Sequence, residues 1–236
     1  MASPMTRQVY YPTSDGLPMA ESDFQRKPLT YAVEALDAYF QERADVYVSG
    51  NLFIYYEEGN PEAVVAPHVF VVIGAGKRDR ASYVLWEEPK APDFALEITS
   101  RSTRSQDQGA KRGMYAFLGV QEYVQYDPTG DYLEPPLKGL RLVDDNYQPM
   151  PTTSLPHGGL GLHSDVLGLD LRLEHGMLRF FDPMTGQSLL TYREAEQARR
   201  EAEERAQAAE ARIAELEARL QALQAEHPSP QPPPTS

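Results

Sequence analysis

The sequence predicts a mixed α/β fold that is followed by a long C-terminal helix. Residues 93–99 have the pattern of a strand, residues 105–118 that of a helix, and residues 122–126 that of a second strand. A strand, a helix and a strand in close succession are typical of a βαβ crossover, in which the two strands run parallel. Residues 193–226 are almost purely Ala, Glu, Arg, Gln and Leu, which is a long-helix composition.

Four further strands and one helix are expected before this unit. Residues 28–43 place their apolar side chains on one helical stripe, with Pro28 in the first turn. Residues 46–56 have the pattern of a hairpin with its turn near residues 49–51. Residues 64–74 are nearly all apolar, which predicts a central strand covered on both sides, and residues 82–87 predict another strand.

Short β elements are expected after the crossover unit, over residues 139–190. They include a hairpin around residues 182–186, DPMTG. We therefore expect one globular domain over residues 1–192. It precedes a coiled-coil helix over residues 193–226 and a disordered Pro-rich tail over residues 227–236.

Net charge limits the kinds of partner that the chain can bind. Six Lys/Arg and nine Asp/Glu in residues 193–236 account for −3 of the net charge of −13, which leaves −10 on residues 1–192. Because DNA affinity comes largely from Lys and Arg that neutralise phosphates, a broad nucleic-acid-binding surface is excluded. Two local basic groups are left as candidates, although each of their residues alone is better explained as a solvated charge. They are Lys77, Arg78 and Arg80, and Arg101, Arg104, Lys111 and Arg112.

The sequence predicts a cytoplasmic protein without a membrane span. It has no run of eighteen apolar residues, and its first residues lack the apolar stretch of a secretory signal. The absence of cysteine excludes disulfides, thiolate metal sites and cysteine nucleophiles together.

The C-terminal helix carries a regular apolar seam. Seven apolar residues recur at alternating spacings of four and three, as in a coiled coil: Ala202, Ala206, Ala209, Ile213, Leu216, Leu220 and Leu223. The helix could instead pack on its own domain. Charged residues surround the seam on the other faces, so we expect a homo-oligomer formed through residues 193–226, as a dimer or a trimer.

Glu97 is an acid inside an apolar strand. Alternation along that strand puts Asp93, Glu97 and Thr99 on one face and only apolar residues on the other. Burial of an unpaired carboxylate costs on the order of several kcal/mol or more, or forces the group to take up a proton. Unless this face is an exposed edge, Glu97 must therefore meet a structural partner or a metal ion.

Lys111 on the following helix is a candidate partner for Glu97. Asp107, Lys111 and Met114 share one helical stripe, and the Met114 end of that stripe should face the core. Gly109 and Gly113 flank the lysine and would let the helix approach the sheet closely. The alternative is an ordinary Asp107–Lys111 pair on the helix surface, worth about 0.3–0.5 kcal/mol.

The block APDFALEITSRSTRSQDQGAKRGMYAFLGVQEYVQYDP resembles the core of the Uma-two family of restriction endonucleases, within the PD-(D/E)XK nuclease superfamily. The resemblance covers roughly residues 10–185. Residues 92–128 carry its most specific part, and YPTSDGLPMAES and YYEEGNP also look typical of one subgroup. The resemblance implies a restriction-endonuclease-like mixed sheet flanked by helices, with a metal ion at the site.

The resemblance also assigns residues to the site. Glu97 matches the acid of the (D/E)XK element, whose third position falls on Thr99, so the helix supplies the lysine as Lys111. The dipeptide that matches the PD element is Pro67-His68, which puts histidine where the family has an aspartate. Glu34 on the first helix is a weak match for a further metal-facing acid. Asp93 could be read as the PD aspartate, but it lies on the same strand as Glu97, so we expect it to support the site.

The function implied is hydrolysis of DNA phosphodiester bonds with Mg²⁺ or Mn²⁺. The implied catalytic residues are Glu97 and Lys111, the metal ligands Glu97, His68 and Glu34, the supporting residues Asp93, Thr99 and Asp107, and the nucleic-acid contacts Arg101, Arg104 and Arg112. Mg²⁺ prefers carboxylate oxygens, whereas the histidine nitrogen suits Mn²⁺ or Zn²⁺ better. A second hypothesis is a catalytically degenerate nuclease fold that serves as a binding or scaffold protein.

Overall fold

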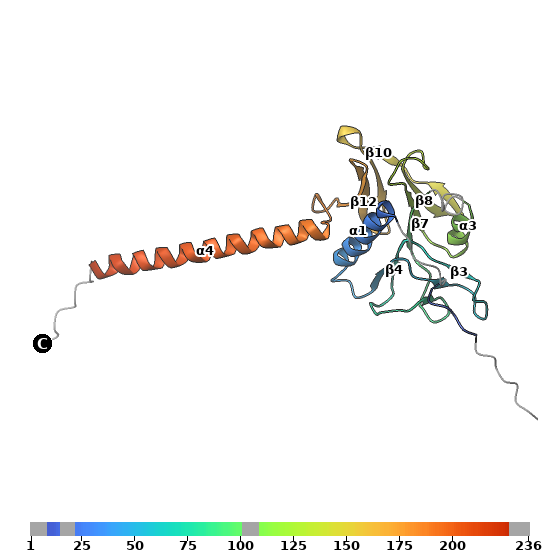
Figure 1. The fold of residues 1–236 in the computed structure, drawn as a ribbon, viewed down its shortest axis with the longest axis horizontal. Coiled ribbons are helices and arrows are strands. Elements are labelled where there is room, and N and C mark those ends of the chain that lie inside the picture. The colour runs from blue at the N-terminus through green and yellow to red at the C-terminus, as the bar shows by residue number, and fades with distance from the viewer. Residues whose placement is uncertain (1–8, 15–21, 101–108, 227–236) are drawn as a thin grey trace, which may run out of the picture. The chain divides into compact units, whose positions relative to one another are not determined.

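The computed structural model describes residues 9–14, 22–100 and 109–226. The chain divides into two compact units, Met1–Leu189 and Leu190–Ser236. The described part of the first unit contains three β-sheets with two α-helices, and the second unit contains the long helix α4 (Tyr192–Glu226) (Figure 1). The mixed α/β architecture and the long C-terminal helix that the sequence predicts are both present.

A mixed six-stranded sheet forms the centre of the first unit. Its strands, in spatial order, are β1 (Val46–Ser49), β4 (Val69–Ile73), β6 (Phe94–Ile98), β7 (Glu122–Tyr126), β8 (Leu137–Val143) and β9 (Asn146–Pro149). Only β6 and β7 run parallel, and helix α3 (Ala110–Phe117) connects them. All other neighbours in this sheet are antiparallel. The predicted βαβ crossover is thus confirmed.

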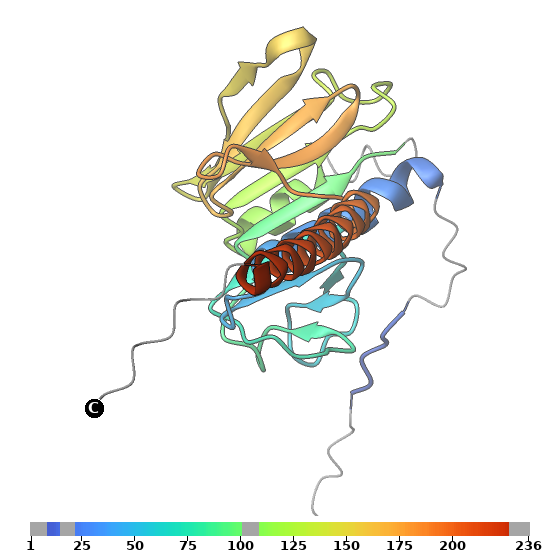
Figure 2. The same cartoon turned by 90° about the vertical axis from the view of Figure 1, so that its left-hand side faces the viewer.

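A five-stranded antiparallel sheet follows in the chain (Figure 2). It consists of β10 (Thr152–Ser154), β11 (Leu160–Ser164), β12 (Leu169–Glu174), β13 (Met177–Asp182) and β14 (Gln187–Ser188), with a short 3₁₀ helix, η1 (Pro156–Gly158), after β10. The predicted hairpin around residues 182–186 joins β13 to β14, with Asp182 opposite Gln187.

The predicted hairpin over residues 46–56 is wrong. β1 pairs with β4, whereas β2 (Ile54–Tyr55) lies in a separate three-stranded sheet between β3 (Val64–Val65) and β5 (Tyr83–Val84). The chain changes sheets at Gly50, where an added Cβ would lie 2.4 Å from the carbonyl oxygen of His68. The glycine that suggested a turn therefore permits a close approach to the chain before β4.

The predicted strand over residues 64–74 is interrupted. β3 ends at Val65 and β4 begins at Val69, with Pro67 between them. Proline has no N–H to give to a ladder, so a continuous strand is disfavoured at this point. The carbonyl groups of Pro67 and His68 instead accept hydrogen bonds from the backbone N–H of Asn51.

The first helix, α1, spans Asp23–Tyr39 and so begins five residues before the predicted start. Ser22 precedes it in an extended conformation, and Asp23 supplies an acid in the first turn, where it pairs with Arg26 at 2.8 Å. Pro28 therefore lies inside the helix. Proline has no N–H, so the carbonyl oxygen of Phe24, four residues earlier, lacks its usual helical donor. Phe24 is exposed, so water can reach this oxygen.

The central sheet is covered on both faces. One core cluster joins the β6 residues Phe94, Leu96 and Ile98 to α1 and to the five-stranded sheet. The other joins Ala95 and Tyr123 to Tyr115 of α3 and to the three-stranded sheet. Glu97 alternates with the first set and therefore faces α3.

Helix α4 is exposed over residues 197–223, which include Ile213, Leu216, Leu220 and Leu223 of the predicted seam. Its apolar residues are separated by charged ones, and no helix within residues 9–14, 22–100 and 109–226 has the length and hydropathy of a membrane span. The tail over residues 227–236, which the sequence predicts to be disordered, lies outside the described residues.

Candidate functional site

Glu97 is fully buried near the carboxyl end of β6, on the face that α3 covers. Its strand neighbours are β4 on one side and β7 on the other, where Gln125 is its register partner. His68 directly precedes β4, and Lys111 and Tyr115 occupy successive turns of α3. The βαβ connection and the antiparallel β4–β6 pair thus bring three distant side chains to one carboxylate.

Three protein donors contact the two oxygens of Glu97. Lys111 Nζ lies 2.9 Å from Oε2, and His68 Nδ1 contacts the same oxygen. The Tyr115 hydroxyl donates to Oε1 at 2.5 Å. An ionised carboxylate only accepts hydrogen bonds, so His68 Nδ1 carries a hydrogen in this arrangement. The group of Glu97, Lys111, His68 and Tyr115 is called the Glu97 cluster below.

The electrostatics of the Glu97 cluster keep the acid ionised. Burial alone raises the pKa of Glu97, but the hydrogen bond from His68 and the positive charge of Lys111 outweigh burial and leave the pKa below its usual value. A buried charge without such partners would take up a proton. At neutral pH the cluster therefore contains a carboxylate and an ammonium group in direct contact.

The cluster reaches solvent only through its basic members. Glu97 has no exposed surface, whereas the side chains of Lys111 and His68 are 18% and 11% exposed. A ligand that approaches this end of the sheet would therefore meet the lysine and the histidine before the acid. Because the exposed members of the cluster are the basic ones, this end of the sheet favours negatively charged ligands such as phosphate.

Asp93 directly precedes β6 and Thr99 directly follows it, and neither contacts the carboxylate of Glu97. Asp93 is buried and is held by Lys90, by Gln121 at 3.0 Å and by the backbone N–H of Ile73 at 2.8 Å. Asp93 thus ties β6 to the neighbouring chain segments. Thr99 is also buried, and its hydroxyl has no hydrogen-bond partner among the described residues.

Glu34 and Arg112 are not brought to the cluster. Glu34 is exposed on α1, which packs on the opposite face of the sheet. Arg112 is exposed and donates to the carbonyl oxygen of Tyr147 at 3.0 Å, at the rim of a groove of about 740 Å³ beside α3. Arg101, Arg104 and Asp107 lie outside the described residues.

The first basic group suggested by the sequence is paired with acids. Arg78 and Arg80 both contact Glu88, at 2.6 and 2.8 Å, and Lys77 lies 3.3 Å from Asp37. The guanidinium of Arg80 also stacks over the ring of Tyr47, 4.1 Å from its centroid. These contacts give the group a structural role, although Arg80, whose side chain is 3% exposed, is not the solvated charge that the sequence predicts.

The described residues do not fit a resident divalent ion. Mg²⁺ needs several oxygen ligands, among which carboxylates supply the charge. Both oxygens of Glu97 already accept hydrogen bonds, and Lys111 adds positive charge beside Oε2. Within residues 9–14, 22–100 and 109–226, no group of three or more His, Cys, Asp or Glu side chains could hold a metal ion.

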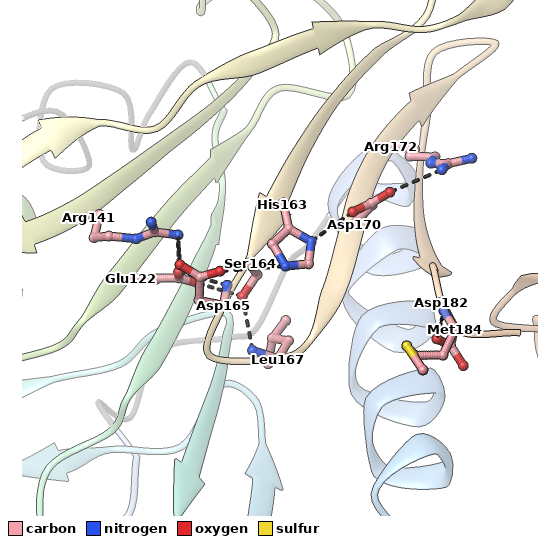
Figure 3. A network of polar contacts seen from close by, with 10 residues as sticks. All are labelled: Glu122, Arg141, His163, Ser164, Asp165, Leu167, Asp170, Arg172, Asp182 and Met184. Carbon is pink, nitrogen blue, oxygen red and sulfur yellow. Dashed lines mark hydrogen bonds and ion pairs between the residues drawn. The ribbon is translucent and has the colours of Figure 1, made fainter. Parts of the chain in front are cut away.

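Two buried polar groups were not singled out from the sequence. Tyr115 follows Lys111 by four residues, so helical spacing could have placed its hydroxyl on the same face. Glu122 was expected only as part of a strand, yet it is 1% exposed and lies at the centre of a second network (Figure 3). No local signal distinguishes Glu122 from an exposed strand acid, because its partners are far away in the chain.

The network around Glu122 joins the two larger sheets. Arg141 of β8 contacts Glu122 at 2.9 Å and Asp165 at 2.7 Å. The Ser164 hydroxyl and the Asp165 backbone N–H, at the turn after β11, also donate to Glu122. Figure 3 shows these groups converging from β7, β8 and the β11–β12 turn. The network therefore holds the six-stranded and the five-stranded sheet together, and it is called a clamp below.

Comparisons with known proteins point to a nuclease family. A sequence model of the Uma2 family, described as "Putative restriction endonuclease", matches residues 15–174. Among solved structures, the first unit is similar to a "putative nuclease belonging to DUF820" from Anabaena variabilis. That similarity has 14% identity and a TM-score of 0.42, and it covers 59% of this chain and 75% of that chain. No curated protein matches the chain.

Proposed function

Because this chain belongs to the Uma2 family of restriction-endonuclease-like proteins, we propose that it is an endonuclease that hydrolyses DNA phosphodiester bonds at the Glu97 cluster. The observation that carries the proposal is the 2.9 Å contact between Lys111 and Glu97 inside the family-matched region. These residues lie on different elements, and only the β6–α3–β7 crossover brings them together.

The two groups suit complementary steps of phosphodiester hydrolysis. Lys111, the more exposed partner, would contact a phosphate oxygen and stabilise the negative charge that develops in the transition state. Glu97 is ionised and would accept a proton from an attacking water. His68 and Tyr115 hold the carboxylate in place through their hydrogen bonds.

Dependence on Mg²⁺ or Mn²⁺ is a prediction from the family resemblance, and the cluster gives it little support. An ion at Glu97 Oε2 would have to replace Lys111 or His68, and it would meet one carboxylate where the family has two. A bound ion would supply activation of water and neutralisation of the phosphate. We expect weak binding of either ion to the free protein, measurable by calorimetric titration.

DNA is the proposed substrate, and the contact is expected to be local. The net −10 on residues 1–192 opposes a broad phosphate-binding surface. Arg101, Arg104 and Arg112 precede or belong to α3 in sequence and are the proposed nucleic-acid contacts. Binding should therefore weaken strongly as salt is added. We also propose a cytoplasmic location, because the protein would meet a DNA substrate there.

A second candidate function is a degenerate nuclease fold that binds or scaffolds without cleaving. The observation in its favour is that His68 occupies the position of the family aspartate and hydrogen-bonds Glu97 directly. The acid is then surrounded by donors, as in a structural ion pair. A buried pair of this kind can be retained for the uniqueness of the fold alone.

Plasmid cleavage with Mg²⁺ or Mn²⁺ separates the two functions. The endonuclease proposal expects nicking by the wild type and loss of nicking in the isosteric Glu97→Gln variant, with both proteins folded by circular dichroism. If the wild type does not cut and His68→Asp cuts, the degenerate function is correct. Cutting that survives in Glu97→Gln rules out the assignment of the site.

We also propose that the chain is a homo-oligomer formed through residues 193–226. The support is the exposed seam on α4, whose large members Ile213, Leu216, Leu220 and Leu223 are 48–56% exposed. Deletion of residues 193–236 should lower the oligomeric mass by light scattering and leave the first unit folded. An oligomeric mass that survives the deletion contradicts this part of the proposal.

A further inference from the structure

We infer that residues 202–223 of α4 pair with a second copy of this chain as a parallel, in-register, two-stranded coiled coil. The inference rests on the self-association proposed above and is independent of nuclease activity. Its evidence is the pattern of charges beside the apolar seam. That pattern favours one orientation of two identical helices and opposes the other.

The seam residues fill the two core positions of a heptad repeat. Ala206, Ile213 and Leu220 occupy the a positions, and Ala202, Ala209, Leu216 and Leu223 occupy the d positions. All seven lie within the continuous helix α4 and are exposed. A β-branched residue at a with leucine at d, as at Ile213 and Leu216, favours two strands over three.

The positions that flank the seam carry opposite charges on its two sides. Arginine occupies every g position between residues 202 and 223, as Arg205, Arg212 and Arg219. Glutamate occupies every e position in the same range, as Glu203, Glu210 and Glu217. One edge of the seam is therefore basic over three heptads, and the other edge is acidic.

This separation selects a parallel pair. In a parallel coiled coil, each g residue lies beside the e residue of the following heptad on the partner helix. Arg205 would then meet Glu210 of the second copy, and Arg212 would meet Glu217. In an antiparallel pair, g meets g and e meets e, so arginine would lie beside arginine and glutamate beside glutamate.

The flanking side chains can turn toward a partner because they are exposed. In the single helix, Arg212 contacts Glu215 at 2.5 Å, and Arg205 donates to the carbonyl oxygen of Glu201 at 3.1 Å. These contacts lie within the same helix and resemble ordinary surface pairs, which are weak. The interhelical pairs would form beside a buried seam, where water is partly excluded.

A parallel pair has a consequence for the first unit. Each first unit precedes α4 in the chain, so both copies are joined to the same end of the coiled coil. Two Glu97 clusters would then be delivered together to one substrate molecule. An antiparallel pair would attach them to opposite ends.

Disulfide trapping in the full chain tests the orientation, since the natural sequence has no cysteine. The d-position variant Ala202→Cys should cross-link to itself under mild oxidation, and so should Leu223→Cys. Ala211→Cys, at the outer f position of the same helix, is the matched control and should not. Preferential linkage of an Ala202→Cys chain to a Leu223→Cys chain would overturn the parallel orientation.

Charge reversal tests the reason for the orientation. Arg205→Glu with Arg212→Glu should weaken association at least tenfold in analytical ultracentrifugation, because glutamate would then face Glu210 and Glu217 of the partner helix. Adding Glu210→Arg and Glu217→Arg should restore it. Arg193→Glu with Arg200→Glu, both at outer b positions, makes the same charge change and should have little effect.

The possible outcomes are distinct. A wild-type monomer would overturn both the self-association and the orientation, and a trimer would overturn the two-stranded pair. A dimer whose association is unchanged by the Arg205 and Arg212 reversals would remove the charge argument. Plasmid cleavage enters none of these results, so failure of the nuclease proposal is seen separately.

Discussion

Glu97 and Glu122 are two buried carboxylates on neighbouring strands, yet their surroundings differ. Glu97 is unexposed and faces α3, whereas Glu122 is 1% exposed and faces the five-stranded sheet. Each accepts hydrogen bonds from a basic side chain and a hydroxyl. The partners of Glu97 include a lysine and a histidine, but those of Glu122 include an arginine and a backbone N–H.

The difference teaches that burial of an acid does not by itself indicate chemistry. Arginine stays charged at every accessible pH, and a backbone N–H cannot move away, so the Glu122 network suits a permanent clamp. Lysine and histidine can exchange partners and protons. We therefore propose reactivity for Glu97 and a structural role for Glu122.

The largest expected effect is the loss of stability in Glu122→Ala. Removal of the acid leaves the buried Ser164 hydroxyl without its acceptor, whereas Arg141 is 37% exposed and keeps Asp165. We expect a loss of up to about 3 kcal/mol, the upper end for a buried polar group left without a partner. Urea denaturation followed by circular dichroism measures the change. A loss below about 1 kcal/mol, the size of one ordinary hydrogen bond, would show that the network is not a clamp.

The next comparison is between Lys111, which pairs with Glu97 of β6, and Lys90, which pairs with Asp93 directly before β6. Lys111→Met should lower the rate of plasmid cleavage by roughly 100-fold, the typical loss for one transition-state donor. Lys90→Met removes the cation beside Asp93 and is the matched control, with cleavage expected to stay within a factor of about two, a difference below 1 kcal/mol. Equal losses in the two variants would remove the special role of Lys111.

His68→Asp should strengthen the binding of Mn²⁺ by about tenfold or more, an effect similar to other changes around metal ligands. The substitution adds a second carboxylate and removes a hydrogen-bond donor from Glu97. Calorimetric titration of folded protein measures the affinity, and His175→Asp in the exposed turn between β12 and β13 serves as a control. Unchanged affinity would show that position 68 does not face the ion.

The smallest expected effect is in the acid pH dependence of stability. Because the pKa of Glu97 is lowered in the folded protein, its contribution to stability is present above its ordinary value of 4.5 and is lost as the pH falls through the lowered value. The difference in unfolding free energy between wild type and Glu97→Gln should therefore shrink below pH 4.5. A difference that grows on acidification contradicts the assigned direction.

Local pattern predicted the parts of the fold that local contacts determine. The strand, helix and strand that bring Lys111 to Glu97 follow one another in the chain, so periodicity and alternation were sufficient to place both side chains on facing surfaces. The hairpin at residues 46–56 failed because β1 and β2 pair with segments far along the chain. A turn residue such as Gly50 gives the same local pattern whether the next strand pairs with the previous one or joins another sheet.

The residues that surround the two buried acids were predicted with less success. His68 entered through the family motif, because nothing in an apolar segment says which residue of another strand it will face. Glu34 was expected at the site, but α1 packs on the other face of the sheet and leaves it exposed. Glu122 was missed since Ser164 and Arg141 reach it only after the two larger sheets have assembled.

Glu97→Gln and Glu122→Gln, prepared side by side, test the central claim most directly. Plasmid nicking and urea denaturation are measured for both variants at the same folded concentration. We predict that Glu97→Gln abolishes nicking although it remains folded, and that Glu122→Gln lowers stability but nicks at the wild-type rate per folded molecule. Nicking retained in Glu97→Gln, or lost in folded Glu122→Gln, would contradict the assignment of reactivity to one buried acid and of structure to the other.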